Sequence, residues 1–321
     1  MVVGAIPFDS DTPAALTVPE AIIREEGPLE PHAYYRNQSL SSRVVGFDPE
    51  PEEHLRRVEA AIGTIETSKL EKVVLARAVD IEFPEAIDPR LVAARLIDLS
   101  ANRDGFIADL SPAGRPGAML VGSSPEVLVK RQGSTVSAFP LAGSSPRRAS
   151  AAEDHLAGQD LLHSSKDLHE HAFVVDHLRR ALTPLCERLD IPDVPQLIST
   201  NEMWHLGTPI SGTLKDKDLT ALELALAVHP TPAICGTPAE AAQALIETAE
   251  TDRGFYAGAV GWCDSSGDGE FMVAIRCAEV AGDGLSARAW AGGGIVGDSD
   301  AQAELEETTA KLRTILKALS L

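Results

Sequence analysis

Segments with the alternating pattern of β-strands come in consecutive runs in this chain of 321 residues, and helical segments separate the runs. In a parallel α/β fold each strand would be followed by its own helix, so these runs favour an α+β fold with largely antiparallel sheet. The expected strands lie at about 72–83, 104–110, 118–122, 126–139, 196–201, 204–213, 256–264, 269–280 and 284–291.

Helices are expected where apolar residues recur three or four positions apart, as Leu55, Val58 and Ile62 do. Residues 1–50 are rich in Pro, Asp and Glu with weak periodicity, so we expect an irregular lead-in with one or two strands. No linker divides the rest, and residues 51–321 are expected to form a single domain. The expected helices lie at about 51–67, 88–99, 152–189, 217–228, 238–249 and 300–319.

Two acidic helical segments more than a hundred residues apart each place carboxylates on one face. Asp167 and Glu170 share a face at about 100° per residue, as do Glu304 and Glu307, whereas Glu306 is expected to point away. Each segment alone is more typical of a solvated acidic face. If the two segments meet, their oxygen ligands suit Mg²⁺ bound together with an anionic substrate.

The chain is strongly acidic, with 28 Lys and Arg against 48 Asp and Glu, a formal net charge of −20. This balance disfavours nucleic acid or an anionic membrane as the main partner. The four cysteines show no C-x-x-C spacing and are expected to be reduced, mostly buried thiols. No signal peptide or membrane-spanning segment is recognisable, so we expect a soluble, cytoplasmic protein that binds a small molecule.

The glycine-rich segment 292–297 satisfies the pattern G-x-G-x-x-G between a predicted strand and a predicted helix. Only 24 residues follow it, too few to complete a dinucleotide-binding βαβ unit with its ribose-binding acid. We therefore reject dinucleotide binding. A glycine loop before a helix still offers backbone N–H groups to a carboxylate, and this is the function we expect here.

From about residue 52 onward the chain resembles the chorismate-utilising enzymes, and most closely the isochorismate synthases of siderophore and menaquinone pathways. Many sequence blocks in one order carry this resemblance, whereas any one of them alone would be unspecific. The chain departs from the family in having fewer residues before Lys72 than is usual. The blocks are KVVLAR at 72–77, GSSPE at 122–126, PLAGS at 140–144, KDLHEH at 166–171, WHLGTP at 204–209, HPTPAICG at 229–236, RGFYAGAVGW at 253–262, AIRCA at 274–278, AGGGIVG at 291–297 and ELEETTAK at 304–311.

The resemblance implies two large, mostly antiparallel sheets packed together with helices outside and the active site in a cleft. It also implies a reaction in which water attacks ring carbon 2 of chorismate and the hydroxyl on ring carbon 4 leaves. Lys72 matches the family's general base and Glu126 its general acid. A lysine serves as a base where burial and neighbouring cations disfavour its charged form, and a carboxyl serves as an acid where a desolvated cleft keeps it protonated.

The remaining site residues are carried over from the same matched blocks. Mg²⁺ is expected between Glu170 and Glu307, with Asp167 and Glu304 as direct or water-mediated supports. The expected substrate-binding residues include Arg276 for the enolpyruvyl carboxylate, since a guanidinium binds a carboxylate in bidentate fashion. The full expected set for the substrate is Gly143, Ser144, His205, Ala233, Tyr256, Ile275, Arg276, Gly292, Gly294 and Lys311.

A few positions distinguish the reactions within this family. Lys72 stands where the ammonia-using anthranilate synthases carry glutamine, so water is the expected nucleophile. Ala142 stands where aminodeoxychorismate synthases carry a lysine that forms a covalent intermediate. Ala233 and Ile275 are of the isochorismate synthase type, but Tyr256 is of the salicylate synthase type. We expect an isomerase that stops at isochorismate, with salicylate synthase, which goes on to eliminate pyruvate, as the alternative.

Two further classes of protein are weighed from the residues. A zinc hydrolase would use His163, Asp167 and Glu170, which share a helix face at i, i+4 and i+7, although no H-E-x-x-H motif is present. A catalytically inactive scaffold is disfavoured while Lys72 and Glu126 are both present. We expect a monomer that is linked functionally to an isochorismatase or to enzymes of the 2,3-dihydroxybenzoate pathway. The sequence does not decide between siderophore, menaquinone and salicylate pathways.

Overall fold

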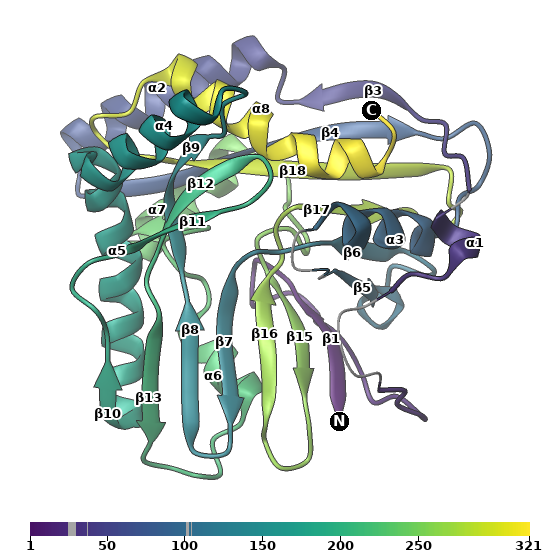
Figure 1. The fold of residues 1–321 in the computed structure, drawn as a ribbon, viewed down its shortest axis with the longest axis horizontal. Coiled ribbons are helices and arrows are strands. Elements are labelled where there is room, and N and C mark those ends of the chain that lie inside the picture. The colour runs from purple at the N-terminus through teal and green to yellow at the C-terminus, as the bar shows by residue number, and fades with distance from the viewer. Residues whose placement is uncertain (25–29, 37, 101–102, 104) are drawn as a thin grey trace.

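The computed structural model describes residues 1–24, 30–36, 38–100, 103 and 105–321. Within this part of the chain, eight-stranded and seven-stranded antiparallel sheets form the body of the molecule, and a three-stranded sheet joins them (Figure 1). The expected α+β architecture of two large antiparallel sheets with helices outside is confirmed. The small third sheet was not expected.

The seven-stranded sheet is organised around one long ladder between β4 and β18. Residues 73–82 of β4 pair with residues 286–295 of β18, and β14 and β3 pair with β4 at opposite ends of its other edge. The central strand β4 is buried on both faces over residues 72–79, as expected for a strand covered on both sides. The strands are β14 (Gly236–Thr237), β4 (Lys72–Glu82), β18 (Ser286–Ile295), β17 (Cys277–Val280), β6 (Met119–Gly122) and β5 (Phe106–Asp109), with β3 (Arg43–Asp48) on β4.

The other two sheets lie towards the ends of these strands. The eight-stranded sheet runs in the order β10 (Cys186–Asp190), β13 (Ile210–Leu214), β8 (Thr135–Phe139), β7 (Val127–Gln132), β16 (Gly269–Val273), β15 (Ala259–Cys263), β1 (Val2–Ile6) and β2 (Ala15–Thr17). The three-stranded sheet runs in the order β11 (Gln196–Ser199), β12 (Met203–Gly207) and β9 (Leu141–Pro146).

The helices cover the outer faces of the sheets. The α2 and α8 helices lie side by side against β4 and β18, and α5 packs on β9 and β12 (Figure 1). The helices are α1 (Ala33–Arg36), α2 (Pro51–Thr67), α3 (Pro89–Leu99), α4 (Ala151–His163), α5 (Ser165–Leu182), α6 (Ala221–Val228), α7 (Ala239–Ala249) and α8 (Ala301–Ala318), with 3₁₀ turns at Ser111–Ala113 and Thr183–Leu185.

The expected helix over 152–189 is wrong in two respects. Ser164 is extended, with φ −70° and ψ 113°, and its side chain accepts a hydrogen bond from the Asp167 N–H, so it ends α4 and caps α5. At the other end, residues 186–190 form an edge strand that pairs with β13. Pairing with a distant strand thus overrides the local helical pattern.

The first fifty residues are more regular than the sequence indicated. Their described part contains three strands and the short α1, and β1 lies in the eight-stranded sheet while β3 lies in the seven-stranded sheet. Residues 25–29 and 37 of this lead-in, and residue 104 of the strand expected at 104–110, lie outside the described residues. The domain boundary at residue 50 stays a prediction.

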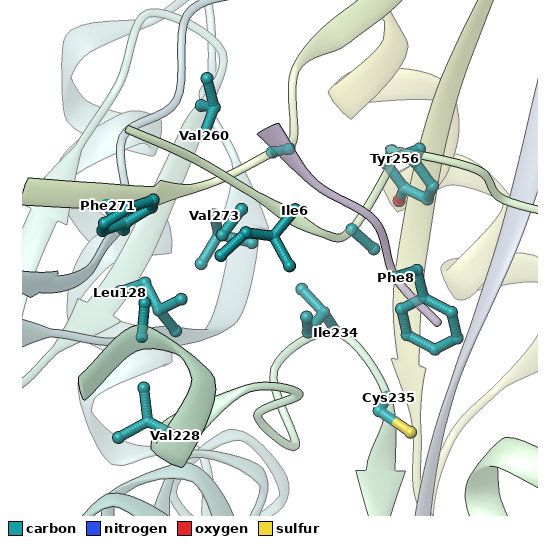
Figure 2. Packing of buried hydrophobic residues seen from close by; sticks show 14 of the residues in the cluster. Ile6, Phe8, Leu128, Val228, Ile234, Cys235, Tyr256, Val260, Phe271 and Val273 are labelled. Carbon is teal, nitrogen blue, oxygen red and sulfur yellow. The ribbon is translucent and has the colours of Figure 1, made fainter. Parts of the chain in front are cut away.

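Apolar side chains from sheets and helices meet in one main core. Figure 2 shows Ile6 and Phe8 of the N-terminal segment among Ile234, Tyr256 and Val273, so the lead-in contributes directly to this core. All four cysteines are free and buried, as expected. Within the described residues, none of the helices combines the length and apolarity needed to cross a membrane.

Candidate active site

A cavity of about 680 Å³, including its open mouth, lies where the three sheets meet. Twelve of the sixteen site residues expected from the sequence line it, and the other four, Lys72, Asp167, Glu304 and Glu307, lie close behind its wall. The lining residues are Val74, Pro125, Glu126, Leu141, Ala142, Gly143, Ser144, Glu170, His205, Ala233, Ile234, Tyr256, Ile275, Arg276, Trp290, Ala291, Gly292, Gly294 and Lys311.

Lys72 begins β4 and is completely buried. Its Nζ lies 3.0 Å from Glu170 Oε1 of α5, but this contact lacks hydrogen-bond geometry, so within the described residues the ammonium nitrogen has an ion-pair partner and no hydrogen-bond acceptor. Gly294 makes the contact possible, because a Cβ there would lie 2.1 Å from Glu170 Oε1 and 2.9 Å from Lys72 Cε. A buried lysine with unused donors is poised to act on a ligand.

Glu126 immediately precedes β7 and is 3% exposed. Its Oε1 accepts a 3.4 Å hydrogen bond from the Leu141 N–H, and its own N–H donates to Ser124 Oγ. Burial raises the pKa of the Glu126 carboxyl to about 7, and this outweighs the Leu141 N–H bond and the Lys72 charge, which lower it. A carboxyl in this range holds its proton near neutral pH, as a general acid requires.

Glu304 of α8 is 1% exposed and has one satisfied and one unsatisfied oxygen. Its Oε1 accepts hydrogen bonds from Lys166 Nζ at 2.8 Å and from Ser299 Oγ at 2.9 Å. Among the described residues, its buried Oε2 has no hydrogen-bond partner. Burial and the nearby Glu307 charge raise the pKa of Glu304 to about 7.

Glu307 lies one turn further along α8, on the same face as Glu304. Its Oε1 accepts hydrogen bonds from Ser144 Oγ at 2.8 Å and from Lys311 Nζ. Burial alone would raise the pKa of Glu307, but the Lys311 ammonium group lowers it below its ordinary value. A Cβ added at Gly143 would lie 3.0 Å from the Cβ of Asp167, so α5 lies close against β9. Since Ser144 of β9 also binds Glu307 of α8, both helices converge on this strand.

These carboxylates fit a hard divalent cation in the chemistry of their donors. Four carboxylates face one region, and the unpartnered Oε2 of Glu304 is the kind of buried atom that a cation would satisfy. Lysines form ion pairs with the carboxylates of Glu170, Glu304 and Glu307. In this arrangement, no three His, Cys, Asp or Glu side chains of the described residues are grouped closely enough to share a metal.

Arg276 lies between β16 and β17 in the left-handed region, with φ 51°, which is a strained conformation for an arginine. The side chain is buried, and its Nη1 lies 3.5 Å from the Lys311 carbonyl oxygen. His205 is 5% exposed, and its Nε2 has no partner. Burial, with the Arg276 and Lys311 charges, lowers the pKa of His205 well below its ordinary value, so the imidazole is neutral.

Tyr256 is buried and stacks on Trp290, with ring centroids 5.7 Å apart and planes 9° apart. Sequence reasoning did not select Trp290, although a signal was available. Alternate residues of a strand share a face, so Trp290 is expected beside Gly292 and Gly294. Val74 and Ile234 were also missed, because nothing local distinguishes them from ordinary core residues.

The expected glycine loop is wrong. Gly292 and Gly294 lie inside β18, paired with Ala76 and Val74, so their backbone belongs to a sheet ladder and forms no loop before a helix. Gly292 presents its carbonyl oxygen to Lys311 Nζ at 3.0 Å. The glycines instead leave room, since a Cβ at Gly292 would lie 2.9 Å from the Tyr256 hydroxyl oxygen.

The zinc site weighed from the sequence is also not formed. His163 ends α4 while Asp167 and Glu170 belong to α5, so the three residues do not share one helix. The exposed His163 places its Nδ1 2.7 Å from the Gln159 carbonyl oxygen. As expected, Glu306 points away, since it is exposed and accepts a hydrogen bond from Gln302.

Known proteins resemble this chain along its length. Residues 19–320 match the family model of the chorismate binding enzymes. The chain is 44% identical to the isochorismate synthase DhbC of Bacillus subtilis, over 99% of this chain and 80% of the relative. It is 38% identical to the isochorismate synthase EntC of Escherichia coli, over 100% of this chain and 81% of the relative. The crystal structure of DhbC from Bacillus anthracis superposes with a TM-score of 0.92 at 41% identity, covering 100% of this chain and 83% of the other.

Proposed function

Since the chain belongs to the chorismate binding enzyme family, we propose that it isomerises chorismate to isochorismate. Water attacks ring carbon 2, the ring double bonds shift, and the hydroxyl on carbon 4 leaves. One observation carries this proposal. A completely buried lysine with unused donors and a buried carboxyl with a pKa of about 7 lie at the same cavity, which supplies a base and an acid for the two ends of this reaction.

In this proposal Lys72 accepts a proton from the attacking water, and Glu126 donates a proton to the leaving hydroxyl. Each side chain is held by its own backbone element, Lys72 by the start of β4 and Glu126 by the turn before β7. Holding the two groups in place lowers the entropic part of the barrier, because no side chain has to be recruited during the reaction.

We further propose that the enzyme depends on Mg²⁺. Glu170 and Glu307 would hold the ion, with Asp167 and Glu304 as supports. A bound Mg²⁺ would neutralise and orient a substrate carboxylate. Lys311 and Arg276 are the cations of this chain that line the cavity, and they are suited to the remaining negative charge of the substrate.

Salicylate synthesis is the second candidate, and Tyr256 favours it. The cavity wall combines this tyrosine with Ala233 and Ile275, which are of the isochorismate type. We propose that the reaction stops at isochorismate, because two of the three positions are of that type. The product would then pass to a hydrolase or a ligase that acts on isochorismate, and the enzyme would work as a monomer.

The test is to incubate the purified protein with chorismate and Mg²⁺, resolve the products by chromatography and measure pyruvate by a coupled assay. Isochorismate in equilibrium with chorismate, without pyruvate and only when Mg²⁺ is present, is the expected result. Salicylate with an equal amount of pyruvate would replace the proposal with salicylate synthase. Absence of any conversion would overturn both.

A further inference from the structure

A buried ion pair that the proposed reaction does not use lies directly behind the cavity wall. Arg253 follows α7, and its side chain is 2% exposed, while the Glu250 side chain is 7% exposed. The carboxylate accepts two hydrogen bonds from the guanidinium, from Nε to Oε2 and from Nη2 to Oε1, both at 2.8 Å. This bidentate geometry is the strongest form of such a contact.

The remaining N–H groups of Arg253 bind two backbone segments that form the cavity wall. Nη1 donates to the Ile234 carbonyl oxygen at 2.8 Å, and Nη2 donates to the Val74 carbonyl oxygen at 2.7 Å. Glu250 adds a third contact, because its Oε1 accepts from the Ala76 N–H at 2.7 Å. Val74 and Ile234 both line the cavity. The ion pair therefore fixes the distance between two segments of the wall.

The same arginine also contacts an aromatic side chain of the wall. The Tyr256 N–H donates to the Arg253 carbonyl oxygen at 3.0 Å, and the guanidinium lies 5.9 Å from the Tyr256 ring centroid. The guanidinium also lies 4.6 Å from the ring centroid of Phe8. Figure 2 shows Phe8 near Tyr256, beside Ile234 and Cys235. The N-terminal segment thus closes the back of this arrangement.

We propose that Arg253, braced by Glu250 and Phe8, is a positioning residue for substrate binding. It holds Tyr256, Val74 and Ile234 at the spacing that the substrate requires, without touching the substrate itself. This inference rests on the proposed function. The RGFY segment at 253–256 then supports one wall of the cavity, and Arg253, its first residue, holds that wall in position.

A second buried arginine provides a matched control. The Arg131 side chain is 4% exposed, forms an ion pair with Asp268 at 3.0 Å and donates to the carbonyl oxygens of Ser266 and Lys217. None of these four residues lines the cavity. Arg131→Lys therefore removes the same kind of contact, away from the site.

The experiment compares Arg253→Lys and Arg131→Lys with the unaltered protein in chorismate turnover and thermal unfolding. Both variants should lower Tm, because lysine cannot span several acceptors at once. Only Arg253→Lys should raise KM for chorismate, by about tenfold, while kcat changes less, as expected for lost ground-state binding. If Arg253→Lys does not fold, Glu250→Gln tests the same pair with its volume conserved.

An Arg253→Lys or Glu250→Gln variant with a lower Tm but the same KM as the unaltered protein would overturn this inference, since the ion pair would then contribute to stability alone. An equal rise in KM in Arg131→Lys would also overturn it. Neither result would touch the proposed function, which depends on turnover by the unaltered protein.

Discussion

Two buried ion pairs lie close to the cavity wall, and they differ in how completely their polar atoms are satisfied. Arg253 and Glu250 are joined by two hydrogen bonds and bind three backbone groups as well. Lys72 and Glu170 make a single contact of 3.0 Å, in which Nζ has no hydrogen bond.

This difference distinguishes an ion pair that supports the cavity wall from one that can act on a ligand. A fully satisfied buried pair has nothing left to offer a ligand, and its contacts rigidify the surrounding backbone. A buried ammonium without hydrogen bonds is costly, and such atoms persist where a ligand or a proton transfer uses them. Glu304 and the Lys72–Glu170 pair lie against neighbouring residues of β18, since a Cβ at Gly293 would be 3.0 Å from Glu304 Oε2 and a Cβ at Gly294 would be 2.1 Å from Glu170 Oε1.

The largest expected effect comes from removing the unsatisfied lysine. Lys72→Ala should lower kcat by about a thousandfold or more, as expected for loss of a general base, while chorismate still binds. Turnover and calorimetric binding are measured together. Lys69→Ala, which changes an exposed lysine three residues earlier, is the control. Full activity in Lys72→Ala would show that the base is another group.

Glu126 is expected to make stability depend on pH. Its folded pKa of about 7 is raised from 4.5, so the folded state binds more protons and stability falls as the pH rises from 4.5 through 7. Glu126→Gln should match the unaltered protein near pH 4.5 and exceed its free energy of unfolding by roughly 3 kcal/mol at pH 8.5. Chemical unfolding at both pH values measures this.

The same carboxyl should limit turnover on the alkaline side. If Glu126 is the acid, kcat/KM falls about tenfold for each pH unit well above 7, because the protonated form is lost. A pH-independent stability difference between Glu126→Gln and the unaltered protein would contradict the raised pKa. An alkaline limb that survives in the residual activity of Glu126→Gln would assign that limb to another group.

A change at Glu307 tests the proposed Mg²⁺ site. Glu307→Gln should weaken Mg²⁺ binding and lower turnover together, by about 10- to 100-fold, since the variant loses one charge among the ligands. Glu306→Gln is the matched control, because this neighbouring side chain points away. Isothermal calorimetry and a Mg²⁺ titration of activity give the two values. Equal effects of the two variants would count against this metal site.

The smallest expected effect concerns the lysine that holds Glu304. Lys166→Met leaves this buried carboxylate without its 2.8 Å ion-pair partner, so Tm in EDTA should fall by a few degrees. Added Mg²⁺ should recover more of Tm in the variant than in the unaltered protein, since the cation replaces the lost charge. A Tm that does not respond to Mg²⁺ would show that no cation binds there.

Helical spacing predicted which carboxylates would meet, because position on a helix face depends only on local geometry. Asp167, Glu170, Glu304 and Glu307 face the site, and Glu306 does not. The family blocks placed twelve of the sixteen expected residues on one cavity. The roles of these residues stay predictions until they are measured.

The supporting residues could not be predicted in the same way. The acceptors of Arg253 are backbone carbonyl groups at positions 74 and 234, and no side-chain pattern marks a carbonyl group as a partner. The helix break at Ser164 was missed because serine is tolerated within helices, although it also caps them. Phe8 was missed because the lead-in has weak periodicity, and β1 is held in its sheet by pairing with β15, far along the chain.

The long ladder between β4 and β18 has a consequence for how this enzyme is made. Its partners are separated by 222 residues at one end, from Val73 to Ile295, and by 204 at the other, from Glu82 to Ser286. Contacts of such high sequence separation slow folding, because the intervening chain must be ordered before they form. Gly294 and Glu307 join Lys72 at the site only after nearly the whole chain has left the ribosome, so a nascent chain has no complete site and its exposed strand edges are open to aggregation.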